Sequence, residues 1–327
     1  MTNKLVCVTG GTGYLASKLI EALLEQGYRV RTTVRSLNNY NKVAPLQGLT
    51  SKGDLSLFEA DLLSEGSFKE AIDGCECVFH TASPVITYNL EDPVKQLIEP
   101  AIKGTRNIIQ EAIACASVST VILTSSVAAV KSNAKPEDYV FTEEDWNDST
   151  STQISPYALS KTLAELEAWK LVEGSSVRLV SINPSYILGP SVGIHPESES
   201  ITRIISTFDG SYLEKGAPPI SMCTVDLRNV VEAHIRAFEN HDASGRYIVS
   251  SEESTTVLDW VKILSEDPEF EKHPFPTKLA DGKPTKLRLD PSKAQKELGI
   301  ELIPLQESLL SLARFLKKSG VIKNSKK

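Results

Sequence analysis

Apolar positions follow two different periods along the first half of the chain. Short continuous apolar runs alternate with longer stretches in which apolar residues recur every three or four positions. The first such stretch places Ala16, Leu19, Ile20 and Leu23 at i, i+3, i+4 and i+7. Continuous apolar runs indicate buried parallel strands, and the 3.6-residue period indicates amphipathic helices. The pattern therefore predicts alternating strands and helices.

The predicted elements can be placed along the chain up to residue 183. Strands are expected at residues 5–9, 28–34, 55–60, 77–81, 118–124 and 177–183. Helices are expected from about Ala16 to Gly27 and at residues 93–115 and 156–172. This order is typical of an α/β protein with a Rossmann-type, doubly wound parallel sheet covered by helices on both faces.

The regularity weakens after residue 184. Residues 190–222 are rich in Ser, Pro and Gly, with a helical pattern near 201–208. A strand and helix are expected at 225–238, a strand at 247–250, and helices at 259–263 and 305–316. We expect residues 1–184 with 223–250 to form a dinucleotide-binding domain. Residues 185–222 with 251–327 would form a smaller C-terminal substrate lobe beyond the carboxyl ends of the strands.

Composition narrows the class of protein. The chain has 327 residues, 41% of them apolar, and a net charge of −7. This length supports a large core, and the negative charge does not favour nucleic acid as a partner. No apolar stretch reaches the length of a membrane span or a signal peptide, so we expect a cytoplasmic protein that does not bind membranes. The five cysteines show no metal-ligand spacing, and either a monomer or a homodimer is compatible with the sequence.

A glycine-rich turn joins the first strand to the first helix. Gly10 permits the tight turn, and Gly13 lets the backbone approach a pyrophosphate, which a helix N-terminus favours. Ala16 takes the place of the third glycine. The sequence therefore predicts a dinucleotide site at this turn, formed by Gly10, Thr12, Gly13, Tyr14 and Leu15.

The end of the second strand indicates which dinucleotide is bound. An acid there would hold the ribose 2′-hydroxyl of NAD, but no Asp or Glu lies between Gly27 and Gly53. Arg35 closes the strand instead, and Lys42 follows one loop later. A guanidinium and an ammonium suit a 2′-phosphate, so we predict NADPH. The alternative is that both side chains are only solvated surface.

Two further segments follow predicted strands on the same edge of the sheet. Asp61, next to Leu62, follows the third strand, where an acid can accept the adenine amino group or simply cap the next segment. Thr81, Ala82 and Ser83 follow the fourth strand, where small residues let the backbone lie against a cofactor.

A Tyr and a Lys four positions apart lie on one face of the helix predicted at 156–172. An ammonium at Lys161 is expected to lower the pKa of Tyr157 and make the phenol a proton donor near neutral pH. Ser126, at the end of the fifth strand, would orient a carbonyl oxygen. The alternative is a packed aromatic residue beside a surface lysine. With the glycine-rich turn on the same sheet, the three residues predict carbonyl reduction.

These motifs resemble the extended short-chain dehydrogenase/reductases. The branch that they resemble holds dihydroflavonol reductase, cinnamoyl-CoA reductase and the yeast methylglyoxal and aldehyde reductases. The resemblance extends from Val6 to about Leu316, and Lys131 stands where flavonoid reductases carry an Asn. The segments that carry the resemblance are residues 9–16, 34–36, 79–84, 123–126, 157–165, 183–184, 188–190 and 225–234.

The resemblance implies roles for individual residues. It implies a catalytic triad of Ser126, Tyr157 and Lys161, and it places Pro184, Ile187 and Ser200 near the nicotinamide. The expected function is NADPH-dependent reduction of a small aldehyde or ketone. A nucleotide-sugar epimerase or dehydratase, and a non-catalytic NADP-sensing protein, are the alternatives. The substrate is expected to contact loops around residues 84–88, 127–132 and 191–222.

Overall fold

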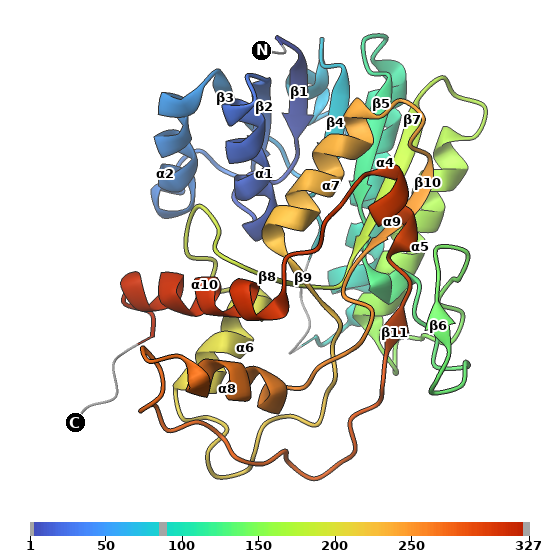
Figure 1. Cartoon of the computed structure of the whole chain (residues 1–327). Coiled ribbons are helices and arrows are strands. Elements are labelled where there is room, and N and C mark those ends of the chain that lie inside the picture. Colours follow the sequence, from blue (N-terminus) through green and yellow to red (C-terminus); the bar gives the residue numbers. More distant parts are fainter. Residues whose placement is uncertain (1–2, 85–89, 323–327) are drawn as a thin grey trace.

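The computed structural model describes residues 3–84 and 90–322, and a seven-stranded parallel sheet lies at its centre (Figure 1). The strand order is β10-β7-β5-β4-β1-β2-β3, and every pair of neighbours is parallel. The strands are β1 (Leu5–Val8), β2 (Arg29–Val34), β3 (Leu55–Glu59), β4 (Cys77–His80), β5 (Thr120–Thr124), β7 (Arg178–Pro184) and β10 (Gly245–Val249). The chain order reverses between β1 and β4, and in sheets of this kind ligands bind beyond the carboxyl ends of the strands at such a point. The predicted doubly wound fold is confirmed.

Alternate side chains of the strands enter two different cores. Val6 and Val8 of β1 pack into one core, and Cys7 between them packs into the other. Helices of the first core are α1 (Tyr14–Glu25), α2 (Tyr40–Gly48), α7 (Leu227–Glu239) and α9 (Ser292–Glu297). Helices of the second core are α3 (Lys69–Ile72), α4 (Glu99–Ala114) and α5 (Pro156–Val172). Burial on both faces explains why these strands read as continuous apolar runs.

A third core lies beyond the carboxyl ends of the strands, in the lower part of Figure 1. Trp260, Ile204 and Leu312 are fully buried in it. Its helices are α6 (Glu199–Phe208), α8 (Val257–Glu266) and α10 (Leu305–Lys318). A short sheet pairs β8 (Tyr186–Leu188) with β9 (Thr224–Asp226), and another pairs β6 (Val140–Phe141) with β11 (Arg288–Leu289).

The helix expected at residues 93–115 and part of the expected C-terminal lobe differ from the sequence-based prediction. The helix expected from residue 93 begins with a five-residue π-helical turn, η2 (Val94–Ile98), and becomes α-helical only at α4. Helix α9 falls within the predicted C-terminal lobe, yet Ala294, Leu298 and Ile300 join the first core. The chain thus returns to the nucleotide half before α10. The domain boundaries given above remain a prediction.

Candidate active site

The glycine-rich turn touches the sheet so closely that side chains cannot be accommodated. Gly10 has a φ of 71°, and a Cβ on it would lie 2.9 Å from the Ala82 Cβ. A Cβ on Gly11 would lie 2.2 Å from the Thr32 Oγ1. The requirement for glycine at position 11 comes from Thr32 on β2 and is therefore not evident from the sequence of the turn. The turn therefore brings bare backbone to the N-terminus of α1, as a pyrophosphate needs.

The turn is also tied to the segment that follows β4. The Thr81 hydroxyl donates to the Thr9 carbonyl at 2.5 Å, and the Ala82 amide donates to the Thr9 hydroxyl at 3.1 Å. These bonds hold the carboxyl ends of β1 and β4 together at the reversal of strand order. Ser83 follows directly and is partly buried. Positions 85–88 of the predicted substrate loop lie outside the described residues.

Arg35 and Lys42 flank an open hollow after β2. The hollow has a volume of about 510 Å³ and is lined by Ser36, Asn38, Asn39, Tyr40 and Asn41. Arg35 is exposed, and within residues 3–84 and 90–322 its guanidinium has no hydrogen-bond or ion-pair partner. Lys42 pairs with Glu197 at 2.9 Å. In the sequence, the two cations stand on either side of the segment that lines this hollow.

An acid does border this region, although it comes from β3. The Glu59 carboxylate accepts a hydrogen bond from the Leu37 amide at 2.6 Å, which fixes the loop after β2. The neighbouring Asp61 is exposed, and its carboxylate accepts from the Leu63 amide at 2.8 Å. Asp61 therefore caps the segment that follows β3, which is one of the two roles predicted for it. Leu62 packs into the second core.

The three proposed catalytic residues meet at the carboxyl end of β5. The Ser126 hydroxyl lies close enough to the Tyr157 hydroxyl to lower the pKa of the phenol. Ser126 also begins η3 (Val127–Ala129) and accepts from the Ala128 amide at 3.1 Å. The Lys161 Nζ lies 5.9 Å from the centre of the Tyr157 ring. The spacing of Tyr and Lys on α5 puts both on the face that turns toward Ser126.

Burial controls the protonation of this cluster. Burial raises the pKa of Tyr157 to about 12. The Ser126 hydroxyl lowers this pKa, and the negative charge of Glu199 raises it further. Burial lowers the pKa of Lys161 to about 8, and the charge of Glu165 opposes this. The expected lowering of the Tyr157 pKa by Lys161 is wrong for the protein alone, because desolvation of the phenolate is the larger effect. The tyrosine is therefore protonated near neutral pH.

The segment after β7 supplies the predicted nicotinamide end. Pro184 is buried at the strand end, and Ile187 on β8 packs against the first core. Ser200 is buried near the start of α6, beside Tyr186. Ser185 is 8% exposed, and its hydroxyl has no hydrogen-bond partner among the described residues. A buried hydroxyl without a partner is costly, so a polar group of a bound molecule fits at this position.

The loop at residues 189–198 crosses over the glycine-rich turn. Tyr14 donates its hydroxyl to the Gly189 carbonyl, and the Ser191 hydroxyl donates to the Tyr14 carbonyl at 2.7 Å. The Ser17 hydroxyl on α1 lies 3.0 Å from the Ser191 hydroxyl and 3.4 Å from the His195 Nε2. Tyr14 and Ser17 thus hold the loop against the turn.

Comparison with known proteins now identifies the family. A model described as the NAD dependent epimerase/dehydratase family matches residues 6–250. The chain belongs to this family. Cinnamoyl-CoA reductase CAD2 from Medicago truncatula is 39% identical, over 96% of this chain and 96% of its own length. An anthocyanidin reductase from Vitis vinifera is 36% identical, over 98% and 97%. The resemblance inferred from the motifs is confirmed.

Solved structures of the same fold include reductases. Yeast methylglyoxal/isovaleraldehyde reductase Gre2 complexed with NADPH matches with a TM-score of 0.84 and 29% identity, over 97% of this chain and 100% of the other. Vestitone reductase from alfalfa matches with a TM-score of 0.79 and 28% identity, over 97% and 99%. The glycine-rich turn, with its missing Cβ atoms, and the unpartnered Ser185 hydroxyl fit a dinucleotide in this member of the epimerase/dehydratase family.

Several other polar residues are structural. Asp226 caps α7 by accepting from the Arg228 amide at 2.8 Å, and the two side chains form an ion pair. His80 and His234 are buried, and burial lowers the pKa of each, to about 3 and about 4. Within the described part of the chain, no three His, Cys, Asp or Glu side chains cluster as metal ligands, and no helix is long and apolar enough to cross a membrane.

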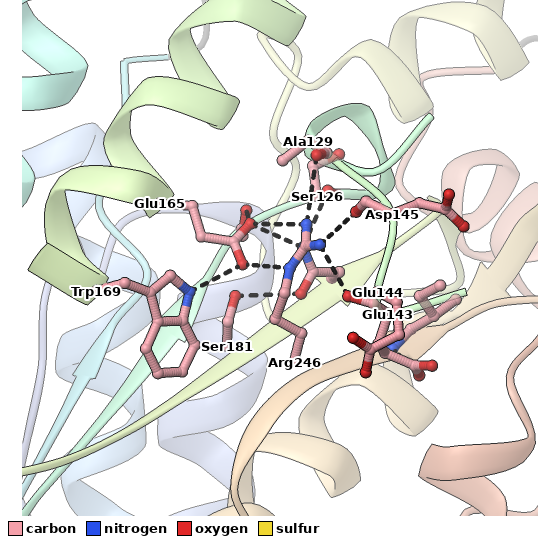
Figure 2. A network of polar contacts seen from close by, with 12 residues as sticks. Ser126, Ala129, Glu143, Glu144, Asp145, Glu165, Trp169, Ser181 and Arg246 are labelled. Atoms are coloured by element: carbon pink, nitrogen blue, oxygen red, sulfur yellow. Dashed lines mark hydrogen bonds and ion pairs between the residues drawn. The ribbon is translucent and has the colours of Figure 1, made fainter. Parts of the chain in front are cut away.

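A buried polar network lies beneath Ser126 and was not predicted from the sequence. Figure 2 shows the Glu165 carboxylate facing the Arg246 guanidinium, with Trp169 and Ser181 close by. Glu165 follows Lys161 by one helical turn, which was a visible signal, because an acid on the inner face of a covered helix requires a partner. Arg246 lies 81 residues away on β10, so the pair itself could not be read from spacing.

Proposed function

We propose that the protein is an NADPH-dependent carbonyl reductase that acts on an aldehyde or ketone. One observation carries the proposal: the Ser126 hydroxyl and the Tyr157 phenol meet beside the buried Lys161, at the same edge of the sheet as the glycine-rich turn. The reductase names of the relatives at 36–39% identity support it.

When bound, NADPH supplies the hydride. The chain's own residues would then act on the substrate oxygen, where negative charge develops. Ser126 would hydrogen-bond this oxygen and orient the carbonyl. Tyr157, which is protonated at neutral pH, would donate the proton that completes the alcohol. Lys161 would bind the nicotinamide ribose and keep a positive charge beside the phenol.

Each remaining part of the cofactor has a proposed set of residues. Gly10, Thr12, Gly13, Tyr14 and Leu15 would surround the pyrophosphate, and Arg35 with Lys42 would bind the 2′-phosphate. Asp61, Leu62, Thr81, Ala82 and Ser83 would lie along the adenosine half. Pro184, Ile187 and Ser200 would lie at the nicotinamide end, and we add Ser185 to this group because of its unpartnered hydroxyl.

The test is an initial-rate screen with NADPH and NADH against aliphatic aldehydes, aryl aldehydes, diketones and dihydroflavonols. We expect turnover of at least one aldehyde or ketone with a clear preference for NADPH. Equal or better use of NADH would overturn the coenzyme assignment. Binding of NADPH without turnover of any carbonyl compound would favour a non-catalytic sensor instead.

A further inference from the structure

Glu165 and Arg246 form an ion pair in the interior of the protein. The Arg246 Nε lies 2.7 Å from the Glu165 Oε1, and the two side chains are 7% and 0% exposed. A second guanidinium nitrogen of Arg246 donates to the other carboxylate oxygen at 3.4 Å. Such a pair gives little net stability over a well-packed apolar pair, because both charges are removed from water. Its presence beside the candidate active site calls for another role.

We propose that Glu165 is a positioning residue of this site: it anchors the backbone that presents Ser126 and places a negative charge next to Lys161. The inference rests on the proposed reductase function. Figure 2 shows the carboxylate at the centre of bonds that come from α5, β7 and β10 and from the segment around Ser126.

The anchoring of Ser126 runs through its two neighbours in the network. The Ser125 hydroxyl donates to the Glu165 carboxylate at 2.5 Å. The Asn183 amide donates to the same carboxylate oxygen at 3.0 Å and to the Ser126 carbonyl at 3.2 Å. The residue before Ser126 and the peptide after it are therefore both tied to one carboxylate. Loss of this acceptor would release Ser126 from its position relative to Tyr157.

Arg246 extends the same network to the segment that follows Ser126. Its guanidinium donates to the carbonyls of Ala129 at 3.3 Å, Glu143 at 3.0 Å and Asp145 at 2.5 Å. The guanidinium also stacks on the Trp146 ring, with its central carbon 3.8 Å from the ring centre. Several turns of irregular chain around η3 thus depend on one buried cation, which the Glu165 carboxylate neutralises.

The charge of Glu165 also acts on Lys161, which lies one turn earlier on α5. The ionisable groups around Lys161 are Tyr157 and Glu165 on its own helix and His80 on β4. His80 is neutral, because burial lowers its pKa to about 3, and Tyr157 is protonated. Glu165 is therefore the group that favours the ammonium form against burial. Without it, the pKa of Lys161 is expected to fall below about 8.

The test begins with Glu165→Gln, which keeps the shape of the side chain and removes its charge. A ¹³C-lysine NMR titration, assigned with Lys161→Met, reports the protonation of Lys161 without any turnover. We expect Lys161 of the Glu165→Gln protein to titrate at lower pH than in the unmodified protein. We also expect kcat for the best carbonyl substrate to fall about tenfold or more, since misplaced catalytic groups lose rate steeply, with KM for NADPH within about twofold.

Glu167→Gln is the matched control, because Glu167 lies on the same helix and pairs with Arg106 of α4 at 2.7 Å. It should leave both the Lys161 titration and kcat unchanged. An unchanged Lys161 titration or an unchanged kcat in a folded Glu165→Gln protein would overturn the inference. If the unmodified protein reduces no carbonyl compound, the proposed function fails, and the titration still reports whether Glu165 controls Lys161.

Glu165→Gln leaves Arg246 buried without a counter-charge and so carries a risk of unfolding. The double variant Glu165→Gln/Arg246→Met removes both charges and is checked for folding by circular dichroism. It should show the same shift of Lys161 to lower pH and the same loss of kcat. A folded double variant with normal kcat would show that the pair serves packing alone and would overturn the inference.

Discussion

The Lys42 ammonium on α2 lies 2.9 Å from the Glu197 carboxylate in the loop that follows β8. This ion pair links the proposed 2′-phosphate site to the loop that crosses the glycine-rich turn. Both side chains are 54% exposed, so solvent weakens the pair. A 2′-phosphate approaching Lys42 would have to compete with Glu197, and its own charge would be repelled by that carboxylate.

Glu197→Gln is therefore expected to strengthen NADPH binding. KM for NADPH should fall by only about two- to fivefold, because an exposed ion pair contributes little free energy, and KM for NADH should not change. Asp54→Asn is a suitable control, because it removes an equally exposed pair with Arg29 at 2.8 Å, far from the site. An equal change with both coenzymes would show that Glu197 acts on the loop and not on the 2′-phosphate.

Arg35→Ala is expected to reduce the preference for NADPH. The guanidinium is exposed and has no partner in the described part of the chain, so it is free to bind a phosphate. A charge-assisted bond to phosphate is worth about 1.5–3 kcal/mol, so kcat/KM for NADPH should fall about ten- to hundredfold while NADH is little affected. The ratio of the two kcat/KM values measures this. Arg29→Ala removes an exposed arginine at the other end of β2 and should leave the ratio unchanged.

The central sheet could be predicted from the sequence because each of its central strands is covered on both faces. Burial on both sides produces the continuous apolar runs of β1, β4, β5 and β7, and these are easily recognised. Helix α2 was not predicted, because Val43 and Leu46 are its only buried residues and Pro45 interrupts its interior. Three-residue strands such as β8 carry too few positions to show a period.

The parts of the candidate site whose residues are close in the sequence could be predicted. The parts that depend on contacts between distant segments could not. Tyr157 and Lys161 share one helix, so their spacing alone places them together. The requirement for glycine at position 11 comes from Thr32, and the buried position of Glu165 requires Arg246. The direction of the Tyr157 pKa shift was mistaken because desolvation depends on the packing around the ring, which spacing does not reveal.

Ser185→Ala separates stability from cofactor binding. Without a ligand, the variant removes a buried hydroxyl that has no partner, so the free energy of unfolding should rise by about 1 kcal/mol. If the hydroxyl contacts NADPH, the thermal stabilisation by saturating NADPH should become smaller in the variant. Thermal melts with and without NADPH measure both effects. A variant that is more stable and keeps the full NADPH shift would remove Ser185 from the site.

The pH dependence of kcat/KM should reflect Lys161 and not Tyr157. Lys161 has a pKa of about 8, so the ammonium is lost as pH rises through 8, and the rate should fall on the alkaline side of that value. Tyr157, with a pKa of about 12, stays protonated throughout this range. Lys161→Arg keeps its charge above pH 10, so any residual activity should lose this alkaline fall. An alkaline fall that persists in the Lys161→Arg protein would assign the ionisation to another group.

Tyr157→Phe tests the proposed proton donor. The variant keeps the aromatic ring and removes only the phenol hydroxyl, so NADPH should still bind with a Kd within about twofold. The rate should fall by about 10²- to 10⁴-fold, the usual contribution of a positioned general acid. Tyr139→Phe removes a phenol that donates to Asp145 at 2.9 Å near β6, and it serves as the control with normal turnover. Near-normal kcat in Tyr157→Phe would mean that the proton reaches the substrate oxygen by another route, with Ser126 or water as the remaining donors at that edge of the sheet.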